Sequence, residues 1–358
     1  MRIFTRYAAV MTLLASSLIA ISLPANAGEV AYIPLGSDNK LVLVDLNKDK
    51  VVGSIKGLPA VHGLAGTPDG KFLIAGSFES RKRGGKTPAK PSGVSPDEHA
   101  AHHKPSASKA GQKSTEISTV SIIRTSDRSI MRRIDVPGAV HHVAISPDGR
   151  YAVVTHPSED KISAIDLKSY EVVANFSTGP LPNYAAFSPD GKSVYVSNSG
   201  NKTVTSVDVS RWIVQWNAIV GESPEHIVLS KSGARLYVNN VDDGSVSIVD
   251  ATERKSVKTI KVGSGLHGID LSEDGKTLFV SVRSDDKLVA IDLATNQSRE
   301  VALSPSPYHL TAIGGLKKVY VSSSDEPKIW VVDQKTMRVT SEIPIGGKGH
   351  QIVVTPGD

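Results

Sequence analysis

The stretch VHHVAISPDG at residues 140–149 decides the fold, because related copies of it recur along almost the whole chain. The last copy, HQIVVTPG, ends at residue 357. Six residues before the turn proline, or before the residue that replaces it, each copy carries a polar marked position. Its occupants are His62, His141, Asn183, Glu225, His267, His309 and His350, if one deletion is placed at Gly314 and Gly315. The steps between them are 79, 42, 42, 42, 42 and 41 residues, which indicates an internal repeat.

A second marker keeps the same period. It is an aspartate that closes an apolar, alternating run, and its copies are Asp45, Asp166, Asp208, Asp250, Asp292 and Asp333. One period, for example residues 140–177, holds four short runs at residues 141–146, 151–155, 162–166 and 172–177, separated by turn residues such as Pro-Asp-Gly. Four antiparallel strands per repeat predict an all-β protein, a β-propeller, because radial repetition buries both faces of each sheet.

The phase of the repeat predicts seven blades and the way the ring closes. Residues 30–35, 41–45 and 51–55 match the second, third and fourth strands of a blade, and residues 350–355 match a first strand. We therefore expect six complete blades and one composite blade, in which the C-terminal strand is innermost. This closure removes a free sheet edge.

The sequence from 188 to 209, SPDGKSVYVSNSGNKTVTSVDV, resembles the YVTN family of β-propeller repeats. That family is related to cytochrome d1 haem-type propellers and to seven-bladed lactonase-like proteins, and the resemblance covers roughly residues 30–358 apart from one insertion. It implies a periplasmic or surface binding propeller, with haem, metal or nucleic acid among the ligands of the family. For a lactonase-like enzyme the candidate residues here are Glu225, His226 and Arg283.

The N-terminal 27 residues predict a secretory signal peptide. Arg2 and Arg6 precede an apolar run at residues 11–23, and Ala25-Asn26-Ala27 is a small-x-small cleavage site, so cleavage is expected after Ala27. We expect one propeller domain at residues 28–358, in the bacterial periplasm, with no transmembrane segment. The chain has no cysteine, which excludes disulfides and thiolate metal sites.

The formal charge of +5 does not indicate a basic protein body. The signal peptide carries +2 and residues 79–116 carry +4, so the remaining chain is close to neutral. Nucleic-acid binding is therefore an unfavoured alternative, restricted to the basic segment.

The repeated marked position predicts a polar ring at one mouth of the channel, where the first strands begin. Its seven residues are His62, His141, Asn183, Glu225, His267, His309 and His350. Imidazole and carboxylate groups are ligands for zinc, copper or iron, and the five histidines are candidate ligands for such an ion or for haem. The alternative is structural: the same side chain makes one hydrogen bond to a neighbouring backbone carbonyl in every blade.

Residues 79–116 interrupt the repeat between the second and third strands of the first complete blade. They are rich in Lys, Pro, Ser and Gly, and we expect them to be disordered. His99, His102 and His103 within them have the i, i+3, i+4 spacing of helical metal ligands. Strand direction predicts that this connection lies at the same mouth as the ring, where the segment would form a flap.

The favoured function is therefore a periplasmic binding or scaffold protein that holds a divalent metal (Zn, Cu or Fe), or a metal-bearing cofactor such as haem, at a histidine-ringed mouth. An enzyme of the lactonase or haem d1 type is the alternative, and no residue is assigned as catalytic. A small ligand is the expected partner, and a protein partner stays open.

Overall fold

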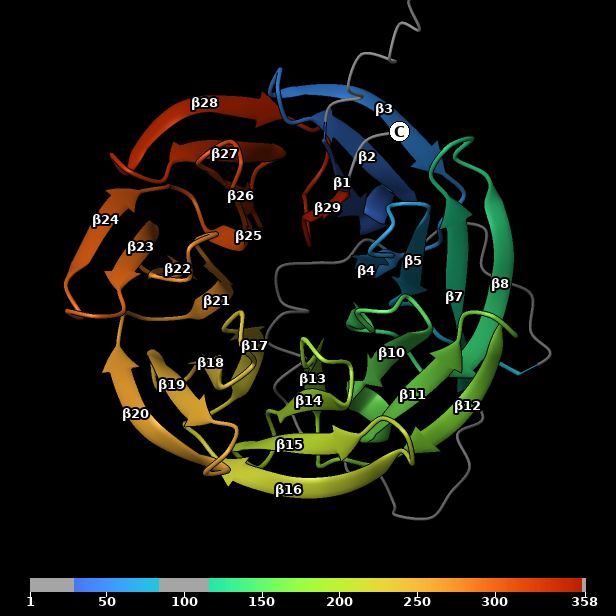
Figure 1. The fold of residues 1–358 in the computed structure, drawn as a ribbon. Helices are drawn as coiled ribbons and strands as arrows, with labels where there is room; N and C mark the ends of the chain where they lie inside the picture. Colours follow the sequence, from blue (N-terminus) through green and yellow to red (C-terminus); the bar gives the residue numbers. More distant parts are fainter. Residues whose placement is uncertain (1–28, 84–115, 356–358) are drawn as a thin grey trace, which may run out of the picture.

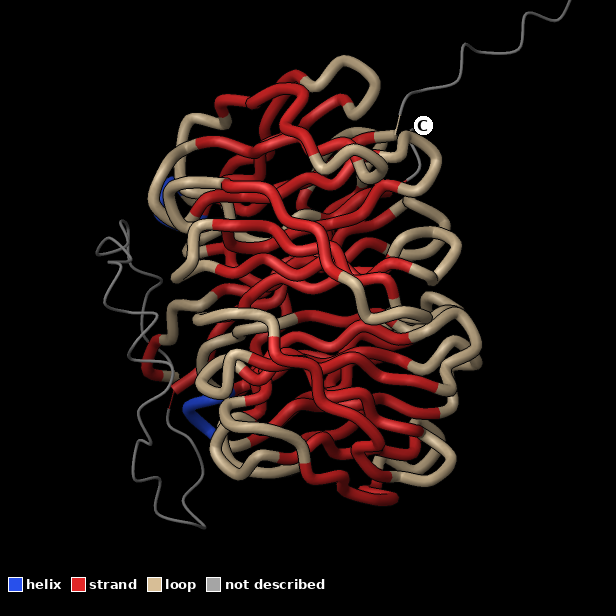
Figure 2. The backbone as a smooth tube through the Cα atoms, turned by 90° about the vertical axis from the view of Figure 1, so that its left-hand side faces the viewer, coloured by secondary structure: helices blue, strands red, loops and turns tan. Residues whose placement is uncertain are grey.

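The chain forms a ring of seven sheets around a central axis, as the repeat predicts (Figure 1). This is a computed structural model, and it describes residues 29–83 and 116–355. The predicted signal peptide and the histidines of the predicted flap, His99, His102 and His103, lie outside the described residues. In the side view, loops gather at the two faces of the ring and strands run between them (Figure 2).

Each blade has four antiparallel strands, numbered from the axis outward. Blade 1 contains β4 (Val61–Gly66), β5 (Phe72–Ser77), β7 (Glu116–Arg124) and β8 (Ile130–Pro137), with the short β6 (Arg81–Lys82) paired to β7. Blade 2 contains β9 (Val143–Ile145), β10 (Tyr151–His156), β11 (Lys161–Asp166) and β12 (Glu171–Phe176). Blade 3 contains β13 (Pro182–Phe187), β14 (Ser193–Asn198), β15 (Thr203–Asp208) and β16 (Ile213–Ile219).

The remaining blades follow the same order. Blade 4 contains β17 (Pro224–Leu229), β18 (Arg235–Asn240), β19 (Ser245–Asp250) and β20 (Lys255–Lys261). Blade 5 contains β21 (Leu266–Leu271), β22 (Thr277–Val282), β23 (Lys287–Asp292) and β24 (Ser298–Ala302). Blade 6 contains β25 (Pro307–Ile313), β26 (Lys318–Ser323), β27 (Lys328–Asp333) and β28 (Arg338–Pro344).

Blade 7 is composite, as predicted. It contains β29 (Val353–Thr355), β1 (Val30–Leu35), β2 (Lys40–Asp45) and β3 (Lys50–Lys56), and β29 pairs with β1 from Tyr32↔Val353 to Val30↔Thr355. Two 3-10 turns, η1 (Gly36–Asp38) and η2 (Pro157–Glu159), link second to third strands in blades 7 and 2. At the seam with blade 6, Lys318 Nζ lies 2.8 Å from Asp49 Oδ1, and Tyr320 donates a hydrogen bond to the same carboxylate.

The hydrophobic core lies between the blades. Each buried cluster of the described residues combines side chains of two neighbouring blades, as where Leu41 and Leu43 of β2 pack with Leu64 and Leu73 of blade 1. The repeated aspartates form the expected turns after the third strands: Asp45 Oδ1, for example, accepts the backbone N–H groups of Asn47 and Lys48 at 3.0 Å. Because every blade is buried on both sides, the ring is stable only when it is closed.

The last residue of the second strand often joins the second and third strands of its blade. Asn198 Nδ2 donates to Thr205 Oγ1 at 2.8 Å, and Asn240 Nδ2 donates to Ser247 Oγ at 2.9 Å. His156 takes the equivalent place in blade 2, where its Nε2 lies 2.8 Å from Ser163 Oγ and its Nδ1 lies 3.1 Å from the carbonyl of Ala139. His156 is thus a buried structural histidine.

We expect His156→Asn to make the protein less sensitive to acid. Burial lowers the pKa of His156 to about 4, whereas in the unfolded chain it is about 6.5. The folded state therefore favours the neutral ring, and this contribution is full above pH 6.5 and is lost as the pH falls toward 4. Urea unfolding of both proteins between pH 7.5 and 5 should show a shallower loss for the variant, by up to about 1.4 kcal/mol per pH unit. Equal slopes would contradict the assignment.

Deleting residues 350–358 should destabilise the ring far more than a tail of nine residues would. The deletion removes β29, exposes the edge of β1 and opens the seams of blade 7. Several kcal/mol of lost stability would lower Tm by roughly 5–10 °C in calorimetry. Removing residues 356–358 alone is the matched control, and equal Tm values for the two truncated proteins would refute this closure.

Candidate metal centre

In five of the seven blades the first strand enters the mouth through a β-bulge. In β21, Leu266 pairs with Val282 and the next pair is Ile269↔Val280, so that His267 and Gly268 stand outside the regular register. The same shift occurs in β4, β13, β17 and β25. A bulge breaks the alternation of side chains, so both of its residues can face the axis.

We call these two residues the first and second bulge positions. The first positions of blades 1 to 7 are His62, His141, Asn183, Glu225, His267, Tyr308 and His350, and the second positions are Gly63, His142, Tyr184, His226, Gly268, His309 and Gln351. In blades 2 and 7 the assignment follows from the register of β9 on β10 and of β29 on β1.

This register corrects one sequence-based assignment. Pro307 pairs with Ser323 and Leu310 with Val321, so Tyr308 occupies the first position in blade 6 and His309 the second. The one-residue deletion therefore lies before Tyr308 and not at Gly314 and Gly315. His309 still faces the axis, because the bulge directs both positions inward.

The side chains at the mouth form a circle of rings in which each is in contact with the next, apart from the sequence neighbours His141 and His142. Centroid distances are 5.0 Å for His62–His141, 3.6 Å for His142–Tyr184, 4.7 Å for Tyr184–His226, 4.5 Å for His226–His267, 4.6 Å for His267–His309, 4.0 Å for His309–His350 and 3.6 Å for His350–His62. The rings of the predicted polar positions and their neighbours thus lie in contact at the mouth.

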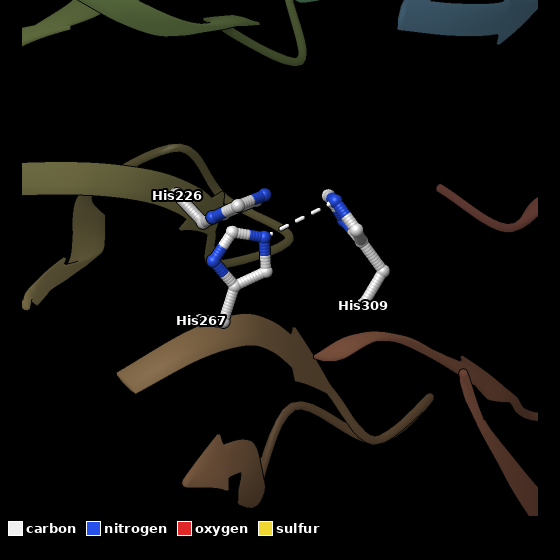
Figure 3. A group of neighbouring side chains, drawn as sticks. All are labelled: His226, His267 and His309. Carbon is white, nitrogen blue, oxygen red and sulfur yellow. Dashed lines mark hydrogen bonds between the residues drawn. The ribbon is translucent and has the colours of Figure 1, made fainter. Parts of the chain in front are cut away.

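Three histidines of this circle could hold one metal ion. His226 from β17, His267 from β21 and His309 from β25 are buried, and their candidate ligand atoms lie within 4.8 Å of one another. Figure 3 shows one ring nitrogen of His226 and one of His267 directed toward His309. The Nε2 atoms of His267 and His309 are 3.2 Å apart, and His350 Nε2 lies 3.1 Å from His309 Nε2.

This spacing fits hydrogen bonding, and it is also close to that of two imidazoles on one metal ion. Two imidazole nitrogens on a tetrahedral ion, with bonds of about 2.0–2.1 Å, stand roughly 3.3–3.4 Å apart. An imidazole nitrogen carries either one proton or one lone pair in the ring plane, so His309 Nε2 cannot make a well-aligned hydrogen bond to both neighbours. A cation among these nitrogens would use all of their lone pairs.

Burial prepares the histidines as ligands. It lowers the pKa of His226 to about 3, with a further contribution from His141, and it lowers the pKa of His309 well below its usual value. Both rings are therefore neutral at pH 7, the form that binds a metal. Burial also raises the pKa of Glu225 to about 8; Asp242 adds to this rise and Arg283 opposes it.

The remaining predicted ring residues have other contacts. His141 Nδ1 lies 3.0 Å from the backbone carbonyl of Asn183, the structural alternative considered for the repeated position. The side-chain oxygen of Asn183 is buried and has no hydrogen bond among the described residues. His62 stacks on His350, and Glu225 Oε2 lies 3.3 Å from His267 Nδ1.

Two histidines of the mouth were missed as ring members. His142 and His226 follow marked positions directly, and only the bulge turns them inward. Both ring nitrogens of His142 already face amide groups, of Ala185 at 3.3 Å and Gln351 at 3.2 Å, so it is a poor ligand. The doublets His141-His142 and Glu225-His226 were the available signal, but a doublet alone does not reveal a bulge.

Hydroxyl groups fix the bulges within and between blades. Ser281 Oγ accepts the backbone N–H of Gly268 at 2.7 Å and donates to the carbonyl of Tyr308 in the next blade. Ser322 Oγ accepts the N–H of His309 at 3.2 Å and donates to the carbonyl of His350 at 3.2 Å. Each link sets the distance between histidines on adjacent blades.

The chain enters the predicted flap from this mouth. Ser77, the last residue of β5, pairs with Val61 at the start of β4, and the ring of Phe78 lies 4.7 Å from that of His62. The connection between β5 and β7 therefore starts at the face predicted from strand direction.

Comparisons with known proteins support the fold. The sequence matches no protein-family profile and no curated protein. Similar solved structures include the periplasmic gluconolactonase PpgL of Pseudomonas aeruginosa (TM-score 0.70, 16% identity, 92% of this chain and 99% of that chain). Others are Kuenenia stuttgartiensis hydrazine synthase (0.66, 16%, 83% and 90%) and the dihydro-heme d1 dehydrogenase NirN (0.63, 11%, 90% and 65%).

At these identities the likeness defines a class, the seven-bladed β-propeller, and nothing narrower. The resemblance to YVTN repeats remains a prediction at the level of the family. Within residues 29–83 and 116–355, no helix has the length and hydropathy needed to cross a membrane.

Replacing Gly268 by alanine should disturb the metal centre through the backbone. The added Cβ would lie 2.7 Å from the carbonyl oxygen of Tyr308 and 2.7 Å from the backbone nitrogen of Leu310, so blade 6 must move away from blade 5. We expect a loss of about 1–3 kcal/mol in urea unfolding. Metal affinity, measured by titration, should fall as well.

Gly315→Ala is the control, because a Cβ at Gly315 meets no atom within 4 Å. Unchanged stability and metal affinity in the Gly268 variant would show that blades 5 and 6 do not need this close approach.

Proposed function

We propose that the protein is a periplasmic metal-binding propeller that holds one divalent transition-metal ion at the mouth of the ring. His226, His267 and His309 are the proposed ligands. The observation that carries the proposal is the convergence of three buried imidazoles from three consecutive blades, with donor atoms within 4.8 Å of one another.

The donor set favours Zn²⁺ or Cu²⁺. Imidazole nitrogen suits these ions, whereas Mg²⁺ and Ca²⁺ prefer oxygen ligands. Cysteine is absent from the whole chain, so no thiolate competes. The neutral state of the buried rings at pH 7 supports binding without prior loss of protons from the ligand nitrogens.

Burial favours a binding role over catalysis. His226, His267 and His309 are each no more than 5% exposed, and His350 Nε2 lies 3.1 Å from His309 Nε2, where it is the candidate for a fourth ligand. Four imidazoles would close a tetrahedral site, whereas a catalytic zinc keeps one position open. The proposed role is therefore to hold or carry the metal.

Haem fits this arrangement poorly. The rings of His226 and His309, two blades apart, have centroids only 4.8 Å from each other, which is too close for a macrocycle to lie between these two rings. The likeness to NirN thus supports the propeller and not a d1 haem site.

The proposed location rests on the predicted signal peptide and agrees with the periplasmic gluconolactonase among the structural neighbours. No lactonase step is proposed, because Glu225 and His226 are both buried, at 1% and 4% exposure. Nucleic-acid binding would depend on the basic residues between positions 83 and 116, and the described residues add no support for it.

The proposal predicts that His267→Ala combined with His309→Ala abolishes the ring site. Metal-free parent protein should bind Zn²⁺ in competition with a chromophoric chelator, and elemental analysis of protein from its native compartment should show the bound metal. Removing two of the three proposed ligands should weaken binding by at least about 100-fold, because only His226 of the three remains.

His156→Asn is the matched control, since His156 is equally buried but lies outside the circle. Binding equivalents that persist in the double variant belong to other histidines. If the parent and the double variant titrate alike, the ring is not the metal site.

A further inference from the structure

One carboxylate lies behind two of the three proposed ligands. Glu225 Oε2 is 3.3 Å from Nδ1 of His267 and 3.9 Å from Nδ1 of His226, and the side chain of Glu225 is only 2% exposed. In Figure 3, the second ring nitrogens of His226 and His267 lie on the side away from His309. Glu225 therefore stands opposite the place where the Nε2 atoms converge.

The position of Glu225 determines which nitrogen each ring can offer. A neutral imidazole carries one proton, and a ring that binds a metal through Nε2 must carry it on Nδ1. A carboxylate that accepts the Nδ1–H holds the ring in this tautomer and orientation and makes it a stronger ligand. His267 Nδ1 lies within hydrogen-bond reach of Glu225 Oε2 at 3.3 Å, whereas His226 Nδ1, at 3.9 Å, is close enough for electrostatic attraction only.

The bulge explains how one residue reaches two ligands. Glu225 and His226 are the first and second positions of the bulge in β17, so both side chains lie at the mouth. His267 is the first position of the next blade, directly beside Glu225. Glu225 of blade 4 is the acid among the seven first positions; the other six blades have histidine, asparagine or tyrosine there.

We propose that Glu225 is a positioning residue for the metal centre: it does not bind the ion, but it orients His267 through Nδ1 and places a negative charge next to the cation and close to His226. This inference rests on the proposed metal site and refines it. The sequence alone placed Glu225 among the candidate ligands; the geometry assigns it the supporting role.

The proposal predicts opposite effects on metal binding and on the metal-free fold. Ionising a buried carboxyl group among neutral rings is unfavourable without a cation, and a bound divalent ion offsets that cost. Glu225→Gln, which keeps the shape and removes the charge, should leave the metal-free protein at least as stable as the parent in urea unfolding. The same variant should weaken Zn²⁺ binding by about 10–100-fold, the usual effect of losing such a partner.

Cobalt reports the ligand set directly. Co²⁺-loaded parent and Glu225→Gln proteins should show visible bands of the same position and intensity, and X-ray absorption should count the same number of imidazoles in both. Glu225→Asp, which keeps the charge but withdraws it from the rings, should have an affinity between those of the parent and Glu225→Gln.

Asp270→Asn is the matched control. Asp270, on β21, lies three residues from His267. Its carboxylate accepts the backbone N–H groups of Ala312 and Leu271 at 2.9 and 2.8 Å, and in these bonds it faces no ring of the centre. Its replacement should lower stability and leave Zn²⁺ affinity within about threefold, since the imidazoles keep their partner.

The outcomes separate the two proposals. If the parent binds no metal, the metal site fails and the role of Glu225 falls with it. If the parent binds and Glu225→Gln binds equally well, only the positioning role is overturned. A changed cobalt spectrum with fewer ligands in Glu225→Gln would make Glu225 a direct ligand, and a large loss of metal-free stability would make it structural; each of these also overturns the proposal.

Discussion

The mouth of the propeller depends on one interaction, the hydroxyl link between neighbouring bulges. Ser281 joins Gly268 in its own blade to Tyr308 in the next, and Ser322 repeats the link from His309 to His350. Because a bulge leaves backbone groups without partners in its own sheet, these serines satisfy buried polar groups and also couple adjacent blades. The distance between the histidines therefore follows from hydrogen bonds between serine hydroxyls and backbone groups, and not from contacts of the imidazoles themselves.

The fold could be predicted almost completely from the sequence, for a physical reason. A propeller is a repeat of short-range hairpins, so its turn residues and aspartates recur with a visible period, and the phase of that period determines the closing strand. The pairing of Val353 with Tyr32 joins the ends of the chain, yet it needed no long-range signal beyond the phase. The alternation of strand direction within a blade likewise predicts the mouth at which the connection between β5 and β7 begins.

The site was less predictable. A repeat alignment compares one marked position in every blade, whereas a bulge directs two adjacent positions of a strand toward the axis. His226 was considered only as an enzyme candidate, and His309 was assigned to the first position by placing a gap several residues too late. Moving the one-residue gap changes little in the alternation of β25, but it decides whether Tyr308 or His309 occupies the first bulge position. Only the pairing of Leu310 with Val321 resolves the choice.

A seven-fold ring of equal histidines would be too wide for one ion, so a metal site in a propeller has to break the symmetry. Blade 5 contributes its first position, His267, and has glycine at the second, which lets the backbone of blade 6 approach closely. Blades 4 and 6 contribute their second positions, His226 and His309, on either side. Three imidazoles from alternating positions thus meet on one side of the axis. On the opposite side, His141 bonds to a backbone carbonyl and His142 to amides, so the differences between the copies, and not the repeat itself, define where a metal can bind.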